Sequence, residues 1–163
     1  MFKSLFKKKV EPEQVQAPLT GKVVSLEEVP DPVFSQKMMG DGVAIIPSDK
    51  QVYSPVDGEI VSVFPTKHAI SLRTKAGAEL LIHMGLETVE LKGEGFQILV
   101  QDGSKVSKGE PIAEFDFEKV SSLGKEVITP IILLNGDQYK IENRQTSTST
   151  TGGKDIIMEL VKA

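Results

Sequence analysis

Short apolar runs, interrupted at regular intervals by Gly, Pro and Asp, dominate this chain from residue 17 to its end. A spacing of about eight to twelve residues between such interruptions is typical of an all-β sandwich or barrel. We expect strands at residues 21–26, 42–47, 58–64, 69–74, 79–83, 96–100, 111–115, 127–135 and 155–162. One short helix is expected at residues 117–123, capped by Asp116 and ended by Gly124.

An internal repeat supports the β prediction. Residues 17–26 (APLTGKVVSL) resemble residues 54–63 (SPVDGEIVSV), and in both copies a Pro and a Gly precede a strand. Pro fixes φ at a turn and Gly accepts tight turn geometry, so the two copies predict equivalent turns in one pseudo-symmetric antiparallel domain. We place this single domain at residues 17–163, with a mobile Ser/Thr/Gly-rich loop at residues 146–153.

The first sixteen residues differ from the rest and are expected to form a flexible tail. Phe2, Leu5 and Phe6 share one face of a short helix, and nearby lysines add positive charge. Weak contact with an anionic membrane surface and a solvated, disordered tail both fit this pattern. Residues 11–16 are interpreted as a linker.

Composition excludes several classes of protein. Asp and Glu (23) outnumber Lys and Arg (19), whereas nucleic-acid binding usually requires a dominant basic face. The absence of cysteine excludes disulfides, thiolate nucleophiles and Cys-type zinc sites. No apolar run approaches the ~20 residues that span a bilayer, and no signal peptide is evident. We therefore expect a cytoplasmic protein, with a peripheral position at the inner face of the cell membrane as the alternative.

The chain has two histidines, His68 and His83. If residues 75–77 form a hairpin turn, the two imidazoles face each other across neighbouring antiparallel strands. A facing pair suits a metal site, in which neutral His is a common zinc ligand. It equally suits phosphoryl transfer, in which one imidazole is the nucleophile and the other stabilises phosphoryl oxygens. Ordinary structural histidines remain the third interpretation.

The sequence around His83 resembles the active-site signature of the glucose-type IIA components of the bacterial sugar phosphotransferase system. The matching segment is GAELLIHMGLETVELKGEGF, residues 77–96. The resemblance continues through residues 17–135, including GDGVAIIPSDKQVYSPVDGEIVSVFPTKHAISLRT and VSKGEPIAEFDFEKV. It implies the duplicated hybrid β motif of that family. Glu87 stands where the family often has Asp, and the loop at residues 146–153 has no clear counterpart.

The resemblance implies roles for four residues. His83 would accept the phosphoryl group through Nε2, and the Gly85 carbonyl would hold the other ring nitrogen. His68 would donate a hydrogen bond to the phosphoryl oxygens, and the Thr66 hydroxyl would orient His68. No cofactor is expected, although His68 and His83 could bind an adventitious or regulatory zinc ion.

The resemblance also implies partners: HPr as phosphoryl donor and the IIB domain of a sugar permease as acceptor. Regulated transporters or kinases are further possible partners. Docking needs apolar side chains around the site, and a loop-like segment at residues 33–39 supplies several. The expected partner-binding residues are Val33, Phe34, Met38, Met39, Phe64, Leu81 and Val89, bordered by Asp31 and Glu87.

Two alternatives come from other protein classes. A zinc hydrolase of the lysostaphin type shares a doubled β motif but needs an Asp and a third His as ligands. A biotinyl or lipoyl carrier domain has similar hairpins, but it presents its modified Lys at a hairpin tip, and Lys37–Met38 matches that poorly. The sequence does not indicate which sugar is served.

Overall fold

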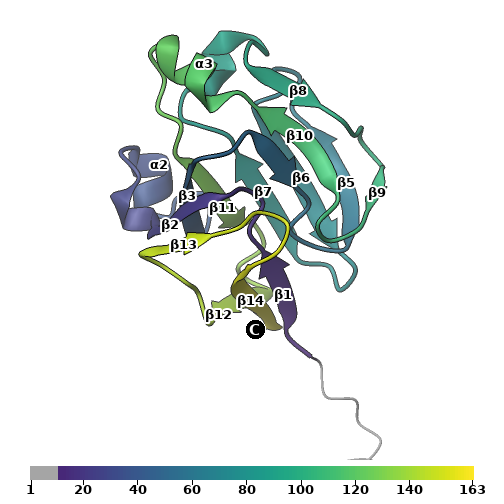
Figure 1. Ribbon diagram of the computed structural model, residues 1–163. Helices are drawn as coiled ribbons and strands as arrows, with labels where there is room; N and C mark the ends of the chain where they lie inside the picture. Colours follow the sequence, from purple (N-terminus) through teal and green to yellow (C-terminus); the bar gives the residue numbers. More distant parts are fainter. Residues whose placement is uncertain (1–10) are drawn as a thin grey trace, which may run out of the picture.

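The computed structural model describes residues 11–163, which form three antiparallel sheets with two short α-helices and two 3-10 helices (Figure 1). The eight-stranded sheet has the order β13-β2-β3-β11-β7-β6-β5-β9, and the three-stranded sheets have the orders β4-β10-β8 and β1-β14-β12. The strands of the large sheet are β13 (Thr148–Thr150), β2 (Gly21–Ser25), β3 (Gly42–Pro47), β11 (Thr129–Leu133), β7 (Glu79–His83), β6 (Ala69–Thr74), β5 (Gly58–Val63) and β9 (Lys105–Val106). The strands of the small sheets are β4 (Gln51–Tyr53), β10 (Pro111–Phe115), β8 (Phe96–Ile98), β1 (Glu13–Gln16), β14 (Ile156–Lys162) and β12 (Tyr139–Glu142). The all-β prediction is confirmed.

Alternation along the central strands builds apolar layers on both faces of the large sheet. On β7, Leu80 and Ile82 point into the main core, whereas Leu81 joins a smaller core on the opposite face. The same alternation divides β3, where Val43 and Ile45 face the main core and Ala44 faces the smaller one. Since Leu81 and His83 are two residues apart, the smaller core lies on the face that carries His83.

The internal repeat is visible as a pseudo-twofold arrangement of the large sheet. Strands β13, β2, β3 and β11 correspond in order to β9, β5, β6 and β7, and the two halves meet where Ile131 pairs with Ile82. The repeated turns also make equivalent bonds: Gly153 N donates to Ala17 O, and Gly109 N donates to Ser54 O, both at 2.8 Å.

The two halves differ in the connection between their second and third strands. In one half, residues 64–68 join β5 to β6 directly. In the other, residues 26–41 form the 3-10 helix η1 (Leu26–Glu28) and the helix α2 (Pro32–Ser35), which lies beside β2 and β3 (Figure 1). Leu26, Val29 and Phe34 from this insertion complete the smaller core. The insertion therefore covers the face of the sheet on which His83 lies.

The second helix α3 (Phe117–Ser122) confirms the helix expected at residues 117–123. The Asp116 side chain accepts a hydrogen bond from Lys119 N at 3.2 Å, and Gly124 takes the left-handed conformation (φ +88°). The remaining 3-10 helix, η2 (Thr88–Leu91), follows the His83 strand.

The prediction of a loop at residues 33–39 is wrong at its start, because Asp31 caps α2 and Pro32 occupies its first turn.

Two other predictions are corrected by strand pairing. The linker expected at residues 11–16 is wrong from Glu13 onward, because β1 pairs with β14 and buries Val15 completely. The loop expected at residues 146–153 contains β13, which pairs with β2. Strands β4, β9 and β12 were not anticipated. The five strands that the sequence did not predict, β1, β4, β9, β12 and β13, are all short. Each depends on a partner distant in sequence or on a single buried side chain.

The membrane contact expected of the N-terminal tail concerns residues that lie outside the described part of the chain. Within residues 11–163, no helix is long and apolar enough to cross a membrane.

Candidate functional site

The two histidines meet at the open end of the β6–β7 hairpin. Ala69 pairs with His83, so His68, one residue before β6, lies diagonally across from it. The ring centroids are 5.0 Å apart and the ring planes are inclined at 76°. The expected facing pair of imidazoles is therefore present.

A tight turn after β7 fixes the His83 ring. Its Nδ1 lies 2.7 Å from the carbonyl oxygen of Gly85. Since a carbonyl oxygen only accepts, Nδ1 carries the hydrogen of the neutral ring and Nε2 carries the lone pair. Gly85 has φ +79°, and a Cβ there would lie 2.7 Å from Glu126 O and 2.7 Å from Thr88 Cγ2. Glycine is thus required both by the backbone conformation and by the space.

Hydrogen bonds to Thr88 and Glu126 hold this turn in place. The buried Thr88 hydroxyl donates to Met84 O at 2.7 Å, and Leu86 N donates to Glu126 O at 3.0 Å. Neither residue was predicted to act in the site. Thr88 lies within the segment that resembles the family signature, which gave it no role. Glu126 contributes only its backbone carbonyl, which no side-chain pattern reports.

His68 is held by its own turn. The Thr66 Oγ1 lies 2.6 Å from His68 Nδ1, as expected, and Met84 N donates to the carbonyl oxygen of His68 at 2.8 Å. Lys67, which lies between Thr66 and His68, adopts the left-handed conformation (φ +64°), and this brings the Thr66 hydroxyl back onto the His68 ring. This hydrogen bond from Met84 N to His68 O links the two histidine turns directly.

Both imidazoles are held in their neutral forms. Burial, followed by the proximity of His83, lowers the pKa of His68 to about 4. Burial also lowers the pKa of His83, while the Gly85 carbonyl and the Asp31 carboxylate act in the opposite direction. Near neutral pH the site therefore offers one unprotonated ring nitrogen as a nucleophile and no competing positive charge.

Two phenylalanine rings flank the histidine pair. Phe34 from α2 lies with its ring centroid 5.0 Å from that of His83, inclined at 55°. Phe64 lies edge-on to His68 at 5.5 Å. Four aromatic rings thus follow one another in contact, in the order Phe34, His83, His68, Phe64.

The expected partner-binding residues divide by exposure. Val33, Met38, Met39 and Val89 are exposed, with Met38 at 69% and Val89 at 50%. Glu87 is also exposed, and Asp31 and Phe64 are half-buried. Phe34 and Leu81 are buried in the smaller core at 3% and 2%, so their expected place on an open docking surface is wrong. Alternation along β7 points Leu81 inward, and the fold of the α2 insertion points Phe34 inward. We refer to Val33, Met38, Met39 and Val89 below as the apolar collar.

Within residues 11–163, no cluster of three or more His, Cys, Asp or Glu side chains is placed to hold a metal ion. The ligand set required by the lysostaphin-type hydrolase is thus not assembled in this part of the chain. Lys37, the candidate for a carrier lysine, follows α2 and forms ion pairs with Glu27 and Asp41 instead of standing at a hairpin tip.

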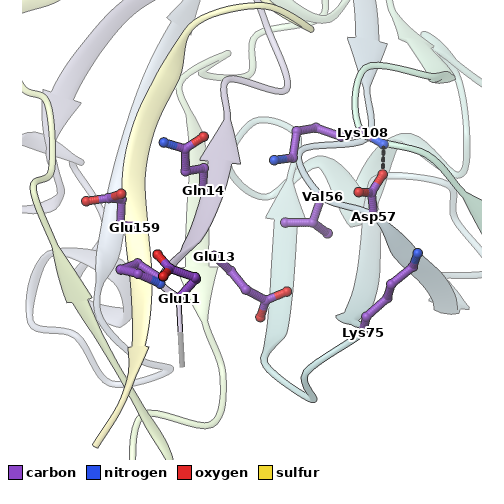
Figure 2. A pocket seen from close by; sticks show the side chains of 9 residues that line it. Glu11, Glu13, Gln14, Val56, Asp57, Lys75, Lys108 and Glu159 are labelled. Atoms are coloured by element: carbon purple, nitrogen blue, oxygen red, sulfur yellow. Dashed lines mark hydrogen bonds between the residues drawn. The ribbon is translucent and has the colours of Figure 1, made fainter. Parts of the chain in front are cut away.

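A separate cavity of about 360 Å³ lies between β1 and the β6–β7 turn (Figure 2). Its side chains mix acids and bases, including Glu13, Asp57, Lys75 and Lys108. Lys75 belongs to the turn of the hairpin whose open end carries the histidines, so this cavity and the histidine site occupy opposite ends of one hairpin.

Comparison with known proteins gives three concordant findings. Residues 13–139 match the family described as phosphoenolpyruvate-dependent sugar phosphotransferase system, EIIA 1. Two similar proteins are each named PTS system glucose-specific EIIA component. The one from Halalkalibacterium halodurans is 49% identical, covering 91% of this chain and 86% of the relative, and the one from Staphylococcus epidermidis is 48% identical, covering 98% of each. The solved glucose permease IIA of Mycoplasma capricolum superposes with a TM-score of 0.86 at 35% identity, covering 92% of this chain and 96% of that one.

Proposed function

Because the chain belongs to the EIIA 1 family of the phosphoenolpyruvate-dependent sugar phosphotransferase system, whose members are phosphoryl carriers, we propose that His83 is the residue that carries the phosphoryl group. The observation that supports this most directly is the 2.7 Å contact between His83 Nδ1 and Gly85 O. It directs the proton to Nδ1 and leaves the Nε2 lone pair free to attack phosphorus. Family membership implies HPr as donor and a IIB domain or permease as acceptor.

In the proposed transfer, Nε2 of His83 attacks the phosphorus atom of phospho-HPr. The bond from phosphorus to the donor breaks, and its electron pair leaves with the donor. The proton on Nδ1 stays in place throughout, held by the Gly85 carbonyl. The same steps run in reverse toward the acceptor, so the site needs accurate positioning more than acid catalysis.

His68 is proposed to stabilise the transferred group without forming a covalent bond. If the Thr66 hydroxyl donates to Nδ1, the ring proton of His68 resides on Nε2 and can be donated to a phosphoryl oxygen. A phosphoryl group brings about 1.5 to 2 negative charges, by analogy with phosphoesters. A fixed donor beside it favours transfer, because the dipole is oriented before the charge arrives.

The finer assignments follow from the relatives' names. Since both similar proteins are named glucose-specific, we propose that the acceptor is a glucose permease. From family membership we also propose that the chain acts in the cytoplasm. The apolar collar, which comes from the α2 insertion and from η2, is the proposed docking surface for both protein partners. His68 and His83 supply two of the four ligands that a zinc ion prefers, and within residues 11–163 no third His, Asp or Glu side chain joins them, so zinc binding would need further ligands.

The proposal is tested by incubating the protein with phosphoenolpyruvate, enzyme I and HPr, followed by transfer to a IIB domain of a glucose permease. We expect an acid-labile phosphate on the wild type and none on His83→Gln. His68→Gln should still be labelled but should pass the phosphate on slowly. Labelling that survives the loss of His83 would refute the assignment.

A further inference from the structure

We propose that Phe34 is a positioning residue for His83: its ring fixes the orientation of the imidazole and keeps water from one side of it. This inference rests on the proposed role of His83 and assigns to Phe34 a function other than docking. A docking residue must be accessible to a partner, whereas Phe34 is 3% exposed.

The contact between the two rings is the first observation. Their centroids are 5.0 Å apart, within the range in which aromatic rings attract each other. Within residues 11–163, His83 makes a single ring hydrogen bond, from Nδ1 to Gly85 O. One hydrogen bond leaves the imidazole free to tilt about that bond, and a flat ring packed against it restricts this motion.

The second observation is that Phe34 is itself held firmly. Asp31 accepts a hydrogen bond from Val33 N at 3.0 Å and so begins α2, and Lys37 N donates to Phe34 O at 3.0 Å. The loop that follows is fixed at Asp41, whose carboxylate receives hydrogen bonds from both terminal nitrogens of Arg144 at 2.6 and 2.9 Å. The phenyl ring is therefore a rigid support.

The third observation concerns the environment of the imidazole. Burial is the main cause of the lowered pKa of His83, and Phe34 supplies one of the apolar surfaces that bury it. Removal of the ring should admit water to that side, and the pKa of His83 should rise toward its ordinary value. At the same time the nucleophile should lose orientation, and small losses of orientation slow transfer strongly.

The experiment compares Phe34→Leu with the wild type by two measurements. NMR titration of the imidazoles, without any partner, should show a higher pKa for His83 in the variant. Labelling by phospho-HPr should show a maximal rate lower by about tenfold, with KM changed by less than twofold. Phe34→Tyr, which keeps the ring, should restore most of the rate.

The matched control is Val24→Ala. Val24 belongs to the same small core but lies on β2, and its loss should lower stability without changing the pKa of His83 or the maximal rate. Backbone amide spectra of each variant establish that it is folded.

A Phe34→Leu protein with raised KM, unchanged maximal rate and unchanged pKa of His83 would overturn the proposal and make Phe34 a docking residue. If the wild type takes no label on His83, the proposed function fails instead. The NMR titration still decides whether Phe34 shields the ring.

Discussion

At Gly85 the backbone turns in the left-handed region two residues after His83, the proposed phosphoryl carrier, and the position has no room for a side chain. We expect Gly85→Ala to lower the free energy of unfolding by about 1 to 3 kcal/mol and to slow labelling of His83, because the carbonyl that holds Nδ1 must move. Gly124→Ala is the matched control: Gly124 has φ +88° but nothing within 4 Å of its added Cβ. It should lose stability by about 1 kcal/mol and keep its labelling rate. Equal labelling rates in the two variants would contradict this account of Gly85.

His68 should make stability depend on pH. Its pKa is about 4 in the folded protein and near 6.5 in the unfolded chain, so between these values the unfolded chain binds more protons. Stability from this residue is therefore complete above pH 6.5 and is lost as pH falls toward 4, by about 3 kcal/mol in total. Denaturant unfolding from pH 7 to 5 should show a shallower pH dependence in His68→Gln than in the wild type. Parallel curves would show that His68 is not buried in its neutral form.

At the scale of secondary structure, the sequence predicted those elements whose boundaries carry local signals. Strands β3, β6, β7 and β10 match their expected limits, because Gly, Pro or a turn adjoins an apolar run in each case. Strand β1 was missed because a polar string surrounds its one buried residue, Val15, and its partner β14 is at the other end of the chain. Helix α2 was missed although Asp31–Pro32 is a recognisable helix start.

The same reasoning applies to the site. Thr66 contacts His68, and His83 contacts Gly85, each across two residues, so a sequence motif can specify each pair. The pairing of β6 with β7 then brings the two pairs together. The contact between Phe34 and His83 joins α2 to β7 and depends on how the insertion folds over the sheet. Local patterns do not encode such a contact, and this is why Phe34 was expected on the surface.

The ion pair between Arg144 and Asp41 joins the segment after β12 to the loop before β3. The Arg144 guanidinium holds the pKa of Asp41 at about 2 and also donates to Gly42 O at 3.0 Å. Both side chains are about one-third exposed, so solvent screening limits the gain. A double-mutant cycle with Arg144→Gln and Asp41→Asn should give a coupling of about 1 kcal/mol in unfolding free energy.

The control for this cycle is Arg73, whose ion pairs with Glu59 and Glu79 are more exposed. These pairs connect only the neighbouring strands β5, β6 and β7 of one sheet. Arg73→Gln should change stability by about 0.5 kcal/mol or less. Coupling between Arg144 and Asp41 no larger than this would mean that the pair does not tie the loop down.

Across the whole molecule, the two halves of the large sheet are alike in backbone and unlike in chemistry. By the pairing of the strands, the position equivalent to His83 is Ile132, which pairs with Gly42 as His83 pairs with Ala69. The half that lacks the histidine instead contributes the insertion at residues 26–41. One half thus supplies the reacting groups, and the other supplies the apolar cover and much of the collar.

The collar should govern encounters between proteins and leave the chemistry unchanged. We expect Met38→Ala and Val89→Ala to raise KM for phospho-HPr several-fold, since each removes exposed apolar surface of the proposed docking collar. Stability should change by less than about 0.5 kcal/mol. Leu99→Ala, which removes an apolar side chain between β8 and β9 that is 48% exposed, close to the 50% of Val89, serves as control and should leave KM unchanged. If all three variants share the wild-type KM, the collar is not the docking surface.

The pairing of β1 with β14 also determines how far the protein can fold while it is being synthesised. Val15 shares the main core with Ile157, Met158 and Leu160, so the core is incomplete until the last strand is available. Contacts between residues so far apart in sequence form slowly, because a long loop must close before they contribute. The segment from Thr66 to Thr88 contains every proposed reacting group, yet it emerges from the ribosome well before the strand that completes its support. A nascent chain should therefore be unable to enter the relay until β14 has left the ribosome.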